Sequence, residues 1–408
     1  MDNLSPSFDS DLRRSPLLVA IFNLVATIIG GGVLSLPLAF AKCGVVLATL
    51  LMVFAAIMTD RSLYLLCITS RKTGAVTYGL VGNAAFGEWM DWFISGLLVV
   101  FLMFVLTAYM VLLKDIWTPL IQLLVTPNVD GGIVLFGIIL VMTPFLVQEN
   151  LHTLRFNCYV GFGAVSILCI ALLRHGLLLV TPSSLKLFPE NFRDVLFSFP
   201  IIVLSFLSTF NVLPIQNALI RPSRERMQWV VTMSVIICFL LMYSFGLGGY
   251  LFAQESTQGN ILLNCNHEED WMFMMGRLGC GITIMLALAM MMLPCRENFL
   301  ELIDIILMHF ARQEQPMMTV GEQTSLLPSS SSPSRQILRS VTKSSWWHYG
   351  STFSILLVCY LGAVMASGVA VVWSLCGSSM AFLIAFILPG GCWIQLQRKQ
   401  EDNIGRSW

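Results

Sequence analysis

The sequence has 408 residues, of which 56% are hydrophobic and 11% charged, and its mean hydropathy is +0.79. Soluble domains carry about 25% charged residues, so this composition excludes an ordinary soluble protein and predicts a chain embedded in a lipid bilayer. Lys and Arg together number 23, as do Asp and Glu, so the formal net charge is zero and no nucleic-acid partner is predicted. The 11 cysteines and five histidines stand without metal-ligand or catalytic spacing. No metal site, cofactor or enzymatic activity is therefore expected.

Apolar stretches long enough to cross about 30 Å of hydrocarbon, which takes about 20 helical residues, recur along the whole chain. We predict ten spans, with approximate bounds 17–41, 45–69, 92–117, 132–148, 157–179, 195–219, 228–252, 271–294, 350–366 and 369–395. The last two are separated only by the short turn Ala366-Ser367-Gly368. They are two spans, because one straight helix over both would extend about 69 Å.

Two of these spans are interrupted. The first contains GGGVLSLP (Gly30 to Pro37), and the sixth contains SFLSTFNVLP (Ser205 to Pro214), so each interruption ends in a proline. In a helix, glycine costs about 1 kcal/mol relative to alanine and proline about 3 kcal/mol. Unpaired backbone groups are tolerated at membrane depth only where they line a cavity or are buried in protein. Broken helices at corresponding places in two halves of a chain predict a transporter with its substrate site near the bilayer midplane.

The distribution of basic residues predicts the orientation. With the N-terminus in the cytosol, most Lys and Arg residues fall on the cytosolic side, as the positive-inside rule requires. The exceptions are Lys42, Lys114, Arg174, Lys186, Arg193 and Arg277. This bias predicts an even number of spans with both termini in the cytosol.

The domain organisation follows from these spans. We expect a cytosolic tail (1–16), spans 1 to 8 (17–311), a disordered Ser/Pro-rich cytosolic loop (312–345), spans 9 and 10 (346–397) and a second cytosolic tail (398–408). Within the loop, Glu322, Leu326 and Leu327 match an acidic dileucine sorting signal. The alternative is that this string is part of a plain solvated linker.

Several motifs resemble the amino acid/auxin permease family, which includes sodium-coupled neutral amino acid transporters and fungal vacuolar amino acid transporters. In family order they are FNLVATIIGGGVLSLP (22–37), TDRSLYLL (59–66), TGAVTYGLVGNAAFG (73–87), PSRERMQ (222–228), GNILLN (259–264), LPCRENF (293–299) and GSSMAFLIAFILPG (377–390). The resemblance implies an all-α membrane protein with the leucine-transporter (LeuT) fold, two inverted repeats of five helices with spans 1 and 6 broken. The family usually has an eleventh span, which the sequence to Trp408 does not contain.

The resemblance also implies where an amino acid substrate binds. Its carboxylate would meet the free N–H groups and positive helix end at the break in span 1, where Gly30, Gly31 and Gly32 allow close backbone approach. Its amino group would meet the unwound part of span 6, near Ser205, Ser208, Thr209 and Asn211. The alternative reading of the glycines is tight helix packing, as small residues allow in membranes.

The sequence determines the coupling ion less clearly than the substrate site. Sodium-coupled members use an Asn four residues before the first glycine and a hydroxyl residue in span 8, and here these positions are Ala26 and Ala287. Alanine offers a hard cation only its carbonyl oxygen, which favours protons over sodium. A rearranged sodium site could use Asn23, Thr27 and Thr283, and the candidates for proton coupling are Asp60 and Asp115. Both aspartates adjoin a basic residue near a span end, so solvated anchors are the alternative role.

The predicted function is secondary active transport of an amino acid by alternating access, with spans 1, 2, 6 and 7 rocking against spans 3, 4, 8 and 9. A neutral substrate is favoured, because the spans around the site lack a charged residue at mid-depth and unpaired charge there costs at least about 2.5–3.5 kcal/mol. The alternatives are an amino acid sensor of the same fold and a transporter of another small amine or organic acid. A vacuolar or lysosomal membrane is slightly favoured over the plasma membrane. One reason is the dileucine string, and the other is that the TDRSLYLL segment most resembles vacuolar members of the family.

Overall fold

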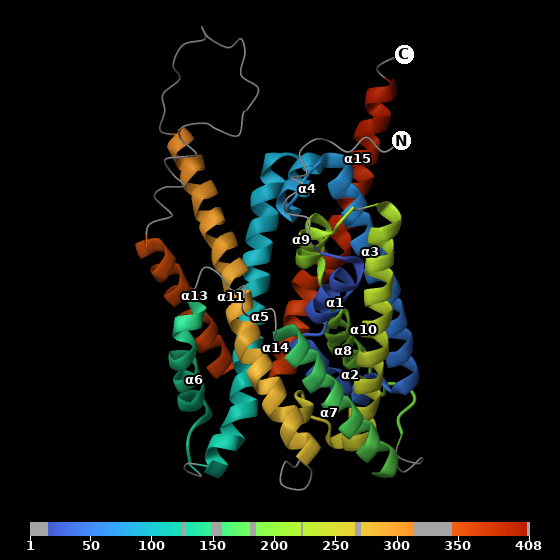
Figure 1. Ribbon diagram of the computed structural model, residues 1–408, viewed down its shortest axis with the longest axis vertical. Helices are drawn as coiled ribbons and strands as arrows, with labels where there is room; N and C mark the ends of the chain where they lie inside the picture. The colour runs from blue at the N-terminus through green and yellow to red at the C-terminus, as the bar shows by residue number, and fades with distance from the viewer. Residues whose placement is uncertain are drawn as a thin grey trace.

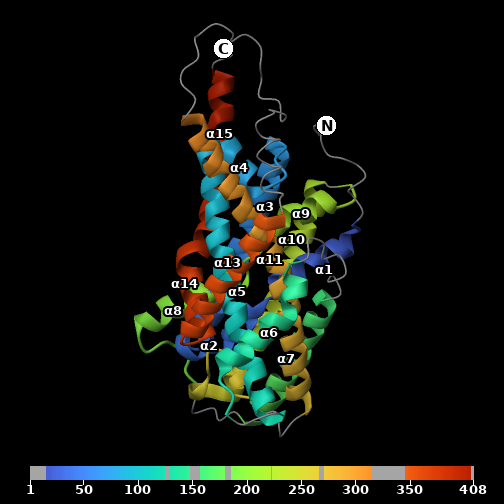
Figure 2. The ribbon, with the colours of Figure 1, turned by 90° about the vertical axis from the view of Figure 1, so that its left-hand side faces the viewer.

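The structure is a computed structural model, and it describes residues 15–124, 128–147, 157–179, 185–221, 223–265, 271–313 and 345–405. Within these ranges the chain is helical, and the only strand-like pairing is an isolated bridge between Ser15 and Leu219. The helices run mostly along the long axis of the molecule (Figures 1 and 2). The all-α prediction is confirmed.

Within the described residues, eight helices are long and apolar enough to span a membrane, and a bent pair in the first span makes a ninth. The remaining predicted span is α6, which is apolar and 16 residues long. The unbroken spans are α3 (Val45–Thr73), α5 (Glu88–Leu124), α6 (Gly131–Leu146), α7 (Asn157–Leu179), α10 (Arg224–Ala253), α11 (Trp271–Gln313) and α13 (Ser345–Met365). A short helix, α4 (Tyr78–Phe86), connects α3 to α5.

Span 1 is broken at its first glycine. Helix α1 (Leu17–Ile28) stops before Gly30, and the 3-10 turn η2 (Gly31–Ser35) leads directly into α2 (Leu36–Cys43). The two halves are bent by 45°. Gly31 and Gly32 therefore form the first turn of the second half, where helix N–H groups have no partner within the helix.

Span 6 is also broken. Helix α8 (Phe192–Ser205) and helix α9 (Thr209–Ala218) are separated by three residues, Phe206 to Ser208. The expectation that a proline ends each break agrees with span 1, where Pro37 lies in the first turn of α2. It is wrong for span 6, because Pro214 lies inside α9. Proline suits a first helical turn, where its missing N–H is not needed.

The two broken spans are tied to each other at both ends. Near the start of α1, the Ser15 N–H donates to the carbonyl of Ala218 at 2.9 Å, and the Ile220 N–H donates to the carbonyl of Ser15 at 3.0 Å. At the other end, the Lys42 ammonium of α2 pairs with the Asp194 carboxylate of α8 at 2.9 Å. Spans 1 and 6 are therefore connected above and below their breaks.

Span 10 contains wide helical turns. It runs from α14 (Val369–Cys376) through two π-helical segments, η7 (Gly377–Ala381) and η8 (Leu383–Ile387), into α15 (Leu388–Gly405). The π-helical part coincides with the GSSMAFLIAFILPG motif. The carbonyl of Ile384 accepts a hydrogen bond from the Tyr78 hydroxyl of α4 at 2.9 Å.

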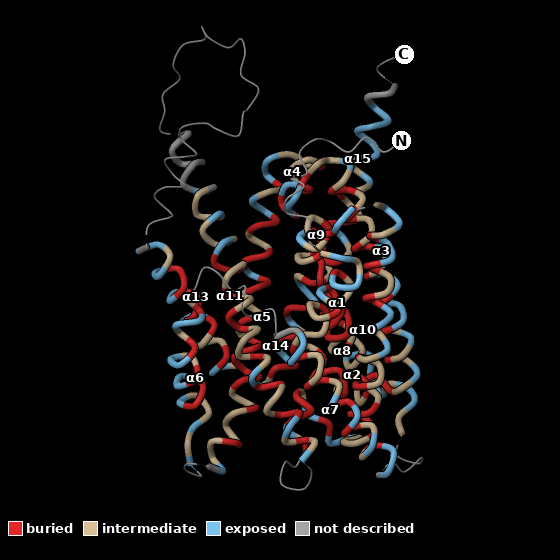
Figure 3. Tube along the Cα trace, viewed as in Figure 1, coloured by how far each residue is buried: buried red, intermediate tan, exposed pale blue. Residues whose placement is uncertain are grey.

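The packing of the helices separates two groups. Helix α10 contacts α1, α2 and α3, and α3 also contacts α8 and α9, so spans 1, 2, 6 and 7 pack together. Helix α5 contacts α6, α11 and α13, which links spans 3, 4, 8 and 9. Buried residues concentrate between the helices, and exposed apolar residues cover the outer surface (Figure 3). An apolar outer surface is suited to contact with lipid.

Candidate functional site

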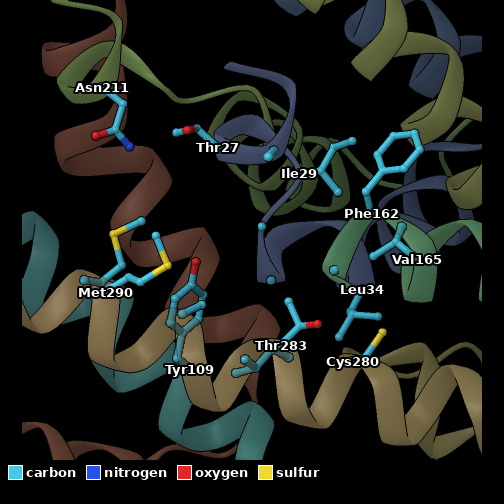
Figure 4. A pocket seen from close by; sticks show the side chains of 17 residues that line it. Thr27, Ile29, Leu34, Tyr109, Phe162, Val165, Asn211, Cys280, Thr283 and Met290 are labelled. Carbon is cyan, nitrogen blue, oxygen red and sulfur yellow. The ribbon is translucent and has the colours of Figure 1, made fainter. Parts of the chain in front are cut away.

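A cavity of about 120 Å³ lies beside the break in span 1 (Figure 4). Its walls come from spans 1, 3, 5 and 8, together with one residue of span 6. The lining residues are Ala26, Thr27, Ile29, Gly30, Gly31, Leu34, Tyr109, Gly161, Phe162, Val165, Asn211, Cys280, Thr283, Ile284, Ala287, Met290 and Met291. Pockets for drug-sized ligands measure about 300–1,000 Å³, so this volume suits a small solute.

Two glycines of span 1, Gly30 and Gly31, lie so close to side chains of α5 that a larger residue would collide with them. A Cβ atom added to Gly31 would lie 2.7 Å from Leu112 Cδ1 and 3.0 Å from Tyr109 Cε1. A Cβ atom on Gly30 would lie 3.2 Å from the Tyr109 hydroxyl oxygen, and that hydroxyl also contacts the Gly31 backbone. The hydroxyl and the first N–H groups of the second half-helix therefore meet at one point of the cavity. Such a point favours an anionic group, because helix N-termini carry a partial positive charge.

The four predicted residues of span 6 are placed differently from one another. Asn211 lines the cavity, but Ser205, Ser208 and Thr209 are buried and lie outside the lining set. The Ser205 hydroxyl donates to the carbonyl of Ile202 in its own helix at 2.7 Å, and the Ser208 hydroxyl is buried without a hydrogen-bond partner. Ser205 also approaches Gly32, because a Cβ on Gly32 would lie 3.5 Å from the Ser205 Cα atom. Gly32 thus faces span 6 rather than the cavity.

The polar groups of the cavity lie on opposite sides of it. Figure 4 shows Thr27 and Asn211 at one end, with Tyr109 and Thr283 across the space from them. The residues that line it include no Asp, Glu, Lys, Arg or His. A buried charge on a ligand side chain would therefore lack a charged partner, which is costly.

The sequence prediction did not include Tyr109, or the apolar wall residues Phe162, Val165, Met290 and Met291, which also line the cavity. Tyr109 had a detectable signal, since it is a lone hydroxyl-bearing aromatic in the long apolar span 3. The wall residues had none, because apolar residues on these spans pack against neighbouring helices as often as they face a cavity.

The two alanines at the positions where the resemblance implies sodium ligands both line the cavity. Ala26 and Ala287 lie near Thr27 and Thr283, whose hydroxyls donate to carbonyls of their own helices, those of Asn23 at 2.8 Å and Gly279 at 2.8 Å. Back-bonding of this kind is usual for threonine within a helix. The Asn23 side chain is not part of the cavity lining.

Neither predicted proton-coupling residue lines the cavity. Asp60 lies on α3, where its Oδ1 accepts a hydrogen bond from the Thr232 hydroxyl of α10 at 2.7 Å. Asp115 lies on α5, six residues after Tyr109, which is about 9 Å along the helix. There it faces the side chain of Asn260, which is buried.

Residues 254–265, which follow α10, cover the second half of span 1. Their short 3-10 turn η6 (Ile261–Leu263) contacts both η2 and α5. The Ser35 hydroxyl of η2 donates to the Gly259 carbonyl at 2.7 Å, and the buried Arg277 of α11 donates to the Leu262 carbonyl. Asp115 thus approaches a segment that is attached to the break in span 1.

The sorting-motif residues Glu322, Leu326 and Leu327 lie outside the described residues. In the part of the chain that is described, no group of three or more His, Cys, Asp or Glu residues could hold a metal ion.

Known proteins resemble this chain over most of its length. The family model described as "Transmembrane amino acid transporter protein" matches residues 13–408. Over 381 residues the chain is 24% identical to "Solute carrier family 38 member 10" of Homo sapiens, covering 90% of this chain and 31% of that protein. It is 23% identical over 410 residues to "Vacuolar amino acid transporter 6" of Saccharomyces cerevisiae, covering 91% of this chain and 88% of that protein. The match to "Vacuolar amino acid transporter 7" of the same yeast is 25% identical over 300 residues, covering 69% of this chain and 58% of that protein. The chain thus spans about a third of the solute carrier relative, 31%.

The fold is shared with a solved transporter. A Na⁺-coupled sialic acid symporter, solved in a substrate-bound outward-open state, superposes with a TM-score of 0.55 and 13% identity, covering 97% of this chain and 81% of that chain. This likeness confirms the LeuT-type fold with two five-helix repeats. The family consists of transporters, so the expectation that the protein is not an enzyme is also confirmed. The chain belongs to the family of transmembrane amino acid transporter proteins.

Proposed function

We propose that the protein is a secondary active transporter that moves a neutral amino acid by alternating access. The observation that carries this proposal is the cavity beside the break in span 1, which offers hydrogen-bonding groups at both ends and no charged side chain among its lining residues. The zwitterionic backbone of an amino acid needs groups of opposite polarity a few ångströms apart. Its neutral side chain needs only an apolar wall.

The substrate carboxylate would bind at the Tyr109 hydroxyl and the first N–H groups of η2, where the helix end is positive. The ammonium would donate to the Asn211 amide oxygen and the Thr27 hydroxyl oxygen at the opposite end of the cavity. Thr27 can accept there because its own proton is donated to the Asn23 carbonyl. The substrate side chain would contact Phe162, which lines the wall.

Proton coupling is the second part of the proposal. The absence of side-chain ligands at Ala26 and Ala287 disfavours a sodium ion bound between spans 1 and 8. Asp115 is the proposed proton acceptor, because its carboxylate faces a segment attached to the span 1 break. The two yeast relatives are named as vacuolar amino acid transporters, which supports a vacuolar or lysosomal membrane as the location.

The test is counterflow of labelled glutamine into proteoliposomes that contain the purified protein. The assay is run with and without sodium, and with an imposed pH gradient. Accumulation that follows the pH gradient in sodium-free buffer is the expected result. Strict sodium dependence would contradict proton coupling. Absence of glutamine transport, together with transport of a labelled amine or organic acid, would contradict the substrate class.

A matched pair of variants tests the cavity itself. Asn211→Ala is expected to reduce uptake, whereas Asn217→Ala, on the same helix but outside the cavity lining, is expected to retain it. Binding of glutamine without any flux would indicate a sensor instead of a transporter.

A further inference from the structure

A second hollow lies on the outer surface of the molecule, in the groove between α3 and α10. It has a volume of about 310 Å³. Its floor is formed by the buried residues Ala56 and Val235, and its rims are the exposed side chains of Val53, Ile57, Ile236 and Leu240. The small alanine between larger rim residues creates the depression. This groove is separate from the substrate cavity, with which it shares no lining residue.

One end of the groove is polar. Asp60 and Arg61 of α3 and Thr232 of α10 line it together. The Thr232 hydroxyl donates to Asp60 Oδ1 at 2.7 Å, while Arg61 Nε lies 4.0 Å from Asp60 Oδ2. The Asp60 side chain is 19% exposed and the Arg61 side chain is 68% exposed. The ion pair is therefore loose, and the guanidinium points largely away from the protein.

The position of this polar end relative to the membrane surface follows from neighbouring residues of α10. Trp229 is exposed on the same helix, and tryptophan is enriched where bilayers meet water. Thr232 follows it by three residues, or about 4.5 Å along the helix. From Thr232 to Leu240 the apolar part of the groove continues about 12 Å deeper. The groove thus has a polar end near the membrane interface and an apolar end towards the bilayer centre.

The charges define the occupant. An exposed arginine slightly below the interface favours an anionic partner, and a lipid phosphate forms strong charge-assisted hydrogen bonds with guanidinium. Asp60 Oδ2 favours a cationic donor. A headgroup that carries both a phosphate and a primary ammonium complements this neutral pair, whereas a choline ammonium has no N–H to donate and an anionic headgroup would repel Asp60.

We propose that this groove binds one glycerophospholipid with an ethanolamine headgroup, its phosphate on Arg61, its ammonium on Asp60 and one acyl chain along Ala56 and Val235. Helix α3 contacts α9, and α10 contacts α1, so the bound lipid lies against helices that hold both broken spans. The proposal concerns the outer surface and does not depend on the substrate or the coupling ion.

The test is native mass spectrometry of the delipidated protein in detergent, titrated with phosphatidylethanolamine, phosphatidylcholine or phosphatidylglycerol of identical acyl chains. We expect one phosphatidylethanolamine to bind about tenfold more tightly than the other two lipids, the effect of one charge-assisted hydrogen bond. Asp60→Asn should abolish that preference, because it removes the contact with the ammonium. Arg61→Gln should weaken the binding of all three lipids, because each of them carries the phosphate. Val53→Trp, which adds bulk at an exposed rim position, should weaken the binding of all three lipids.

Arg174→Gln, at an exposed arginine of α7, is the control and should keep the preference. If Asp60→Asn does not fold, Arg61→Gln still tests the phosphate contact, because that side chain is largely exposed, and the preference of the unsubstituted protein for phosphatidylethanolamine tests the ammonium contact. Equal binding of the three lipids by the unsubstituted protein, or unchanged binding of all three in Arg61→Gln, would show annular lipid only and overturn the proposal. Preferred binding of phosphatidylglycerol would also overturn it, because an anionic headgroup does not use Asp60.

Discussion

The three consecutive glycines of span 1 have three different environments. Gly30 approaches the Tyr109 hydroxyl, Gly31 packs against Leu112 and the Tyr109 ring, and Gly32 faces Ser205 across the bundle. The distances from an added Cβ to its nearest neighbour are 3.2, 2.7 and 3.5 Å in that order. Of these three glycines, only the first two line the cavity. The need for glycine therefore differs at the three positions.

Alanine scanning of the three glycines should reproduce this order. We expect Gly31→Ala to reduce amino acid uptake most, because its methyl group would displace the Tyr109 ring. Gly32→Ala should reduce uptake least, because 3.5 Å is an ordinary van der Waals contact. Initial rates of uptake, normalised to the amount of folded protein, measure the effect. A larger loss in Gly32→Ala than in Gly31→Ala would contradict the geometry.

Tyr109→Phe removes the hydroxyl and keeps the ring, so it tests the hydroxyl alone. Loss of a hydrogen bond to a charged group costs about 1.5–3 kcal/mol, so the substrate concentration for half-maximal uptake should rise at least about tenfold. Tyr360→Phe is the matched control, because the Tyr360 hydroxyl donates to the Gly132 carbonyl at 3.3 Å outside the cavity. An unchanged half-maximal concentration in Tyr109→Phe would argue against carboxylate binding at this hydroxyl.

At the scale of the elements, the wide turns of span 10 allow close packing against span 6. A Cβ on Gly377 would lie 2.5 Å from the carbonyl oxygen of Pro200 in α8. Ser374 also donates to the Phe197 carbonyl of α8 at 3.0 Å. π-Helical turns occur often at functional sites, and here they coincide with the contact between span 10 and a broken span.

Gly377→Ala should destabilise the protein, because the clash involves backbone atoms that cannot move separately. Overpacking of this kind costs about 1–3 kcal/mol, which a lowered midpoint of thermal unfolding in detergent would report. Gly390→Ala, in the same span, has nothing within 4 Å of its added Cβ and should behave like the wild type. Equal unfolding midpoints for the two variants would contradict the close contact.

At the scale of the whole molecule, two features connect the cavity to the rest of the structure. Spans 1 and 6 are joined at both ends, by the pairing of Ser15 with 218–220 and by the ion pair of Lys42 with Asp194. The second feature is the segment 254–265, which is attached to η2 through Ser35 and faces Asp115 through Asn260. A change in the charge of Asp115 would therefore act on segment 254–265, which packs over the second half of span 1, and not on the cavity directly. Lys114, the adjacent cation, donates to the Ala363 carbonyl at 3.1 Å.

Asp115→Asn should uncouple transport from protons without weakening substrate binding. The reason is that Asp115 lies outside the cavity, so the binding groups remain in place. We expect binding of glutamine to be unchanged and accumulation driven by a pH gradient to be lost, while counterflow without a gradient persists. Asp60→Asn, on the outer surface, should keep the pH-driven accumulation. Loss of coupling in Asp60→Asn and its retention in Asp115→Asn would reverse the assignment.

The sequence by itself determined the fold and the place of the breaks. Apolar runs about 20 residues long predict spans because hydrocarbon has a fixed thickness, and glycine at Gly30 and polar residues near Ser208 interrupt helices for local reasons. All ten predicted spans correspond to helices. Pro214 was misjudged, because it is tolerated within the helix that follows the break in span 6, whereas Pro37 stands in the first turn after the break in span 1.

Only the tertiary structure decided which side chains share a space. Asn211 lines the cavity while Thr209, two residues before it on the same helix, does not, and Tyr109 enters from a span with no break at all. It also separated the two candidate aspartates, placing Asp60 at a groove between α3 and α10 and Asp115 beside segment 254–265. The physical reason is that hydropathy depends on residue type and spacing along one helix. The direction in which a side chain points depends on how its helix is rotated and on the helices that pack around it. The spacing of residues along a single span does not carry that information.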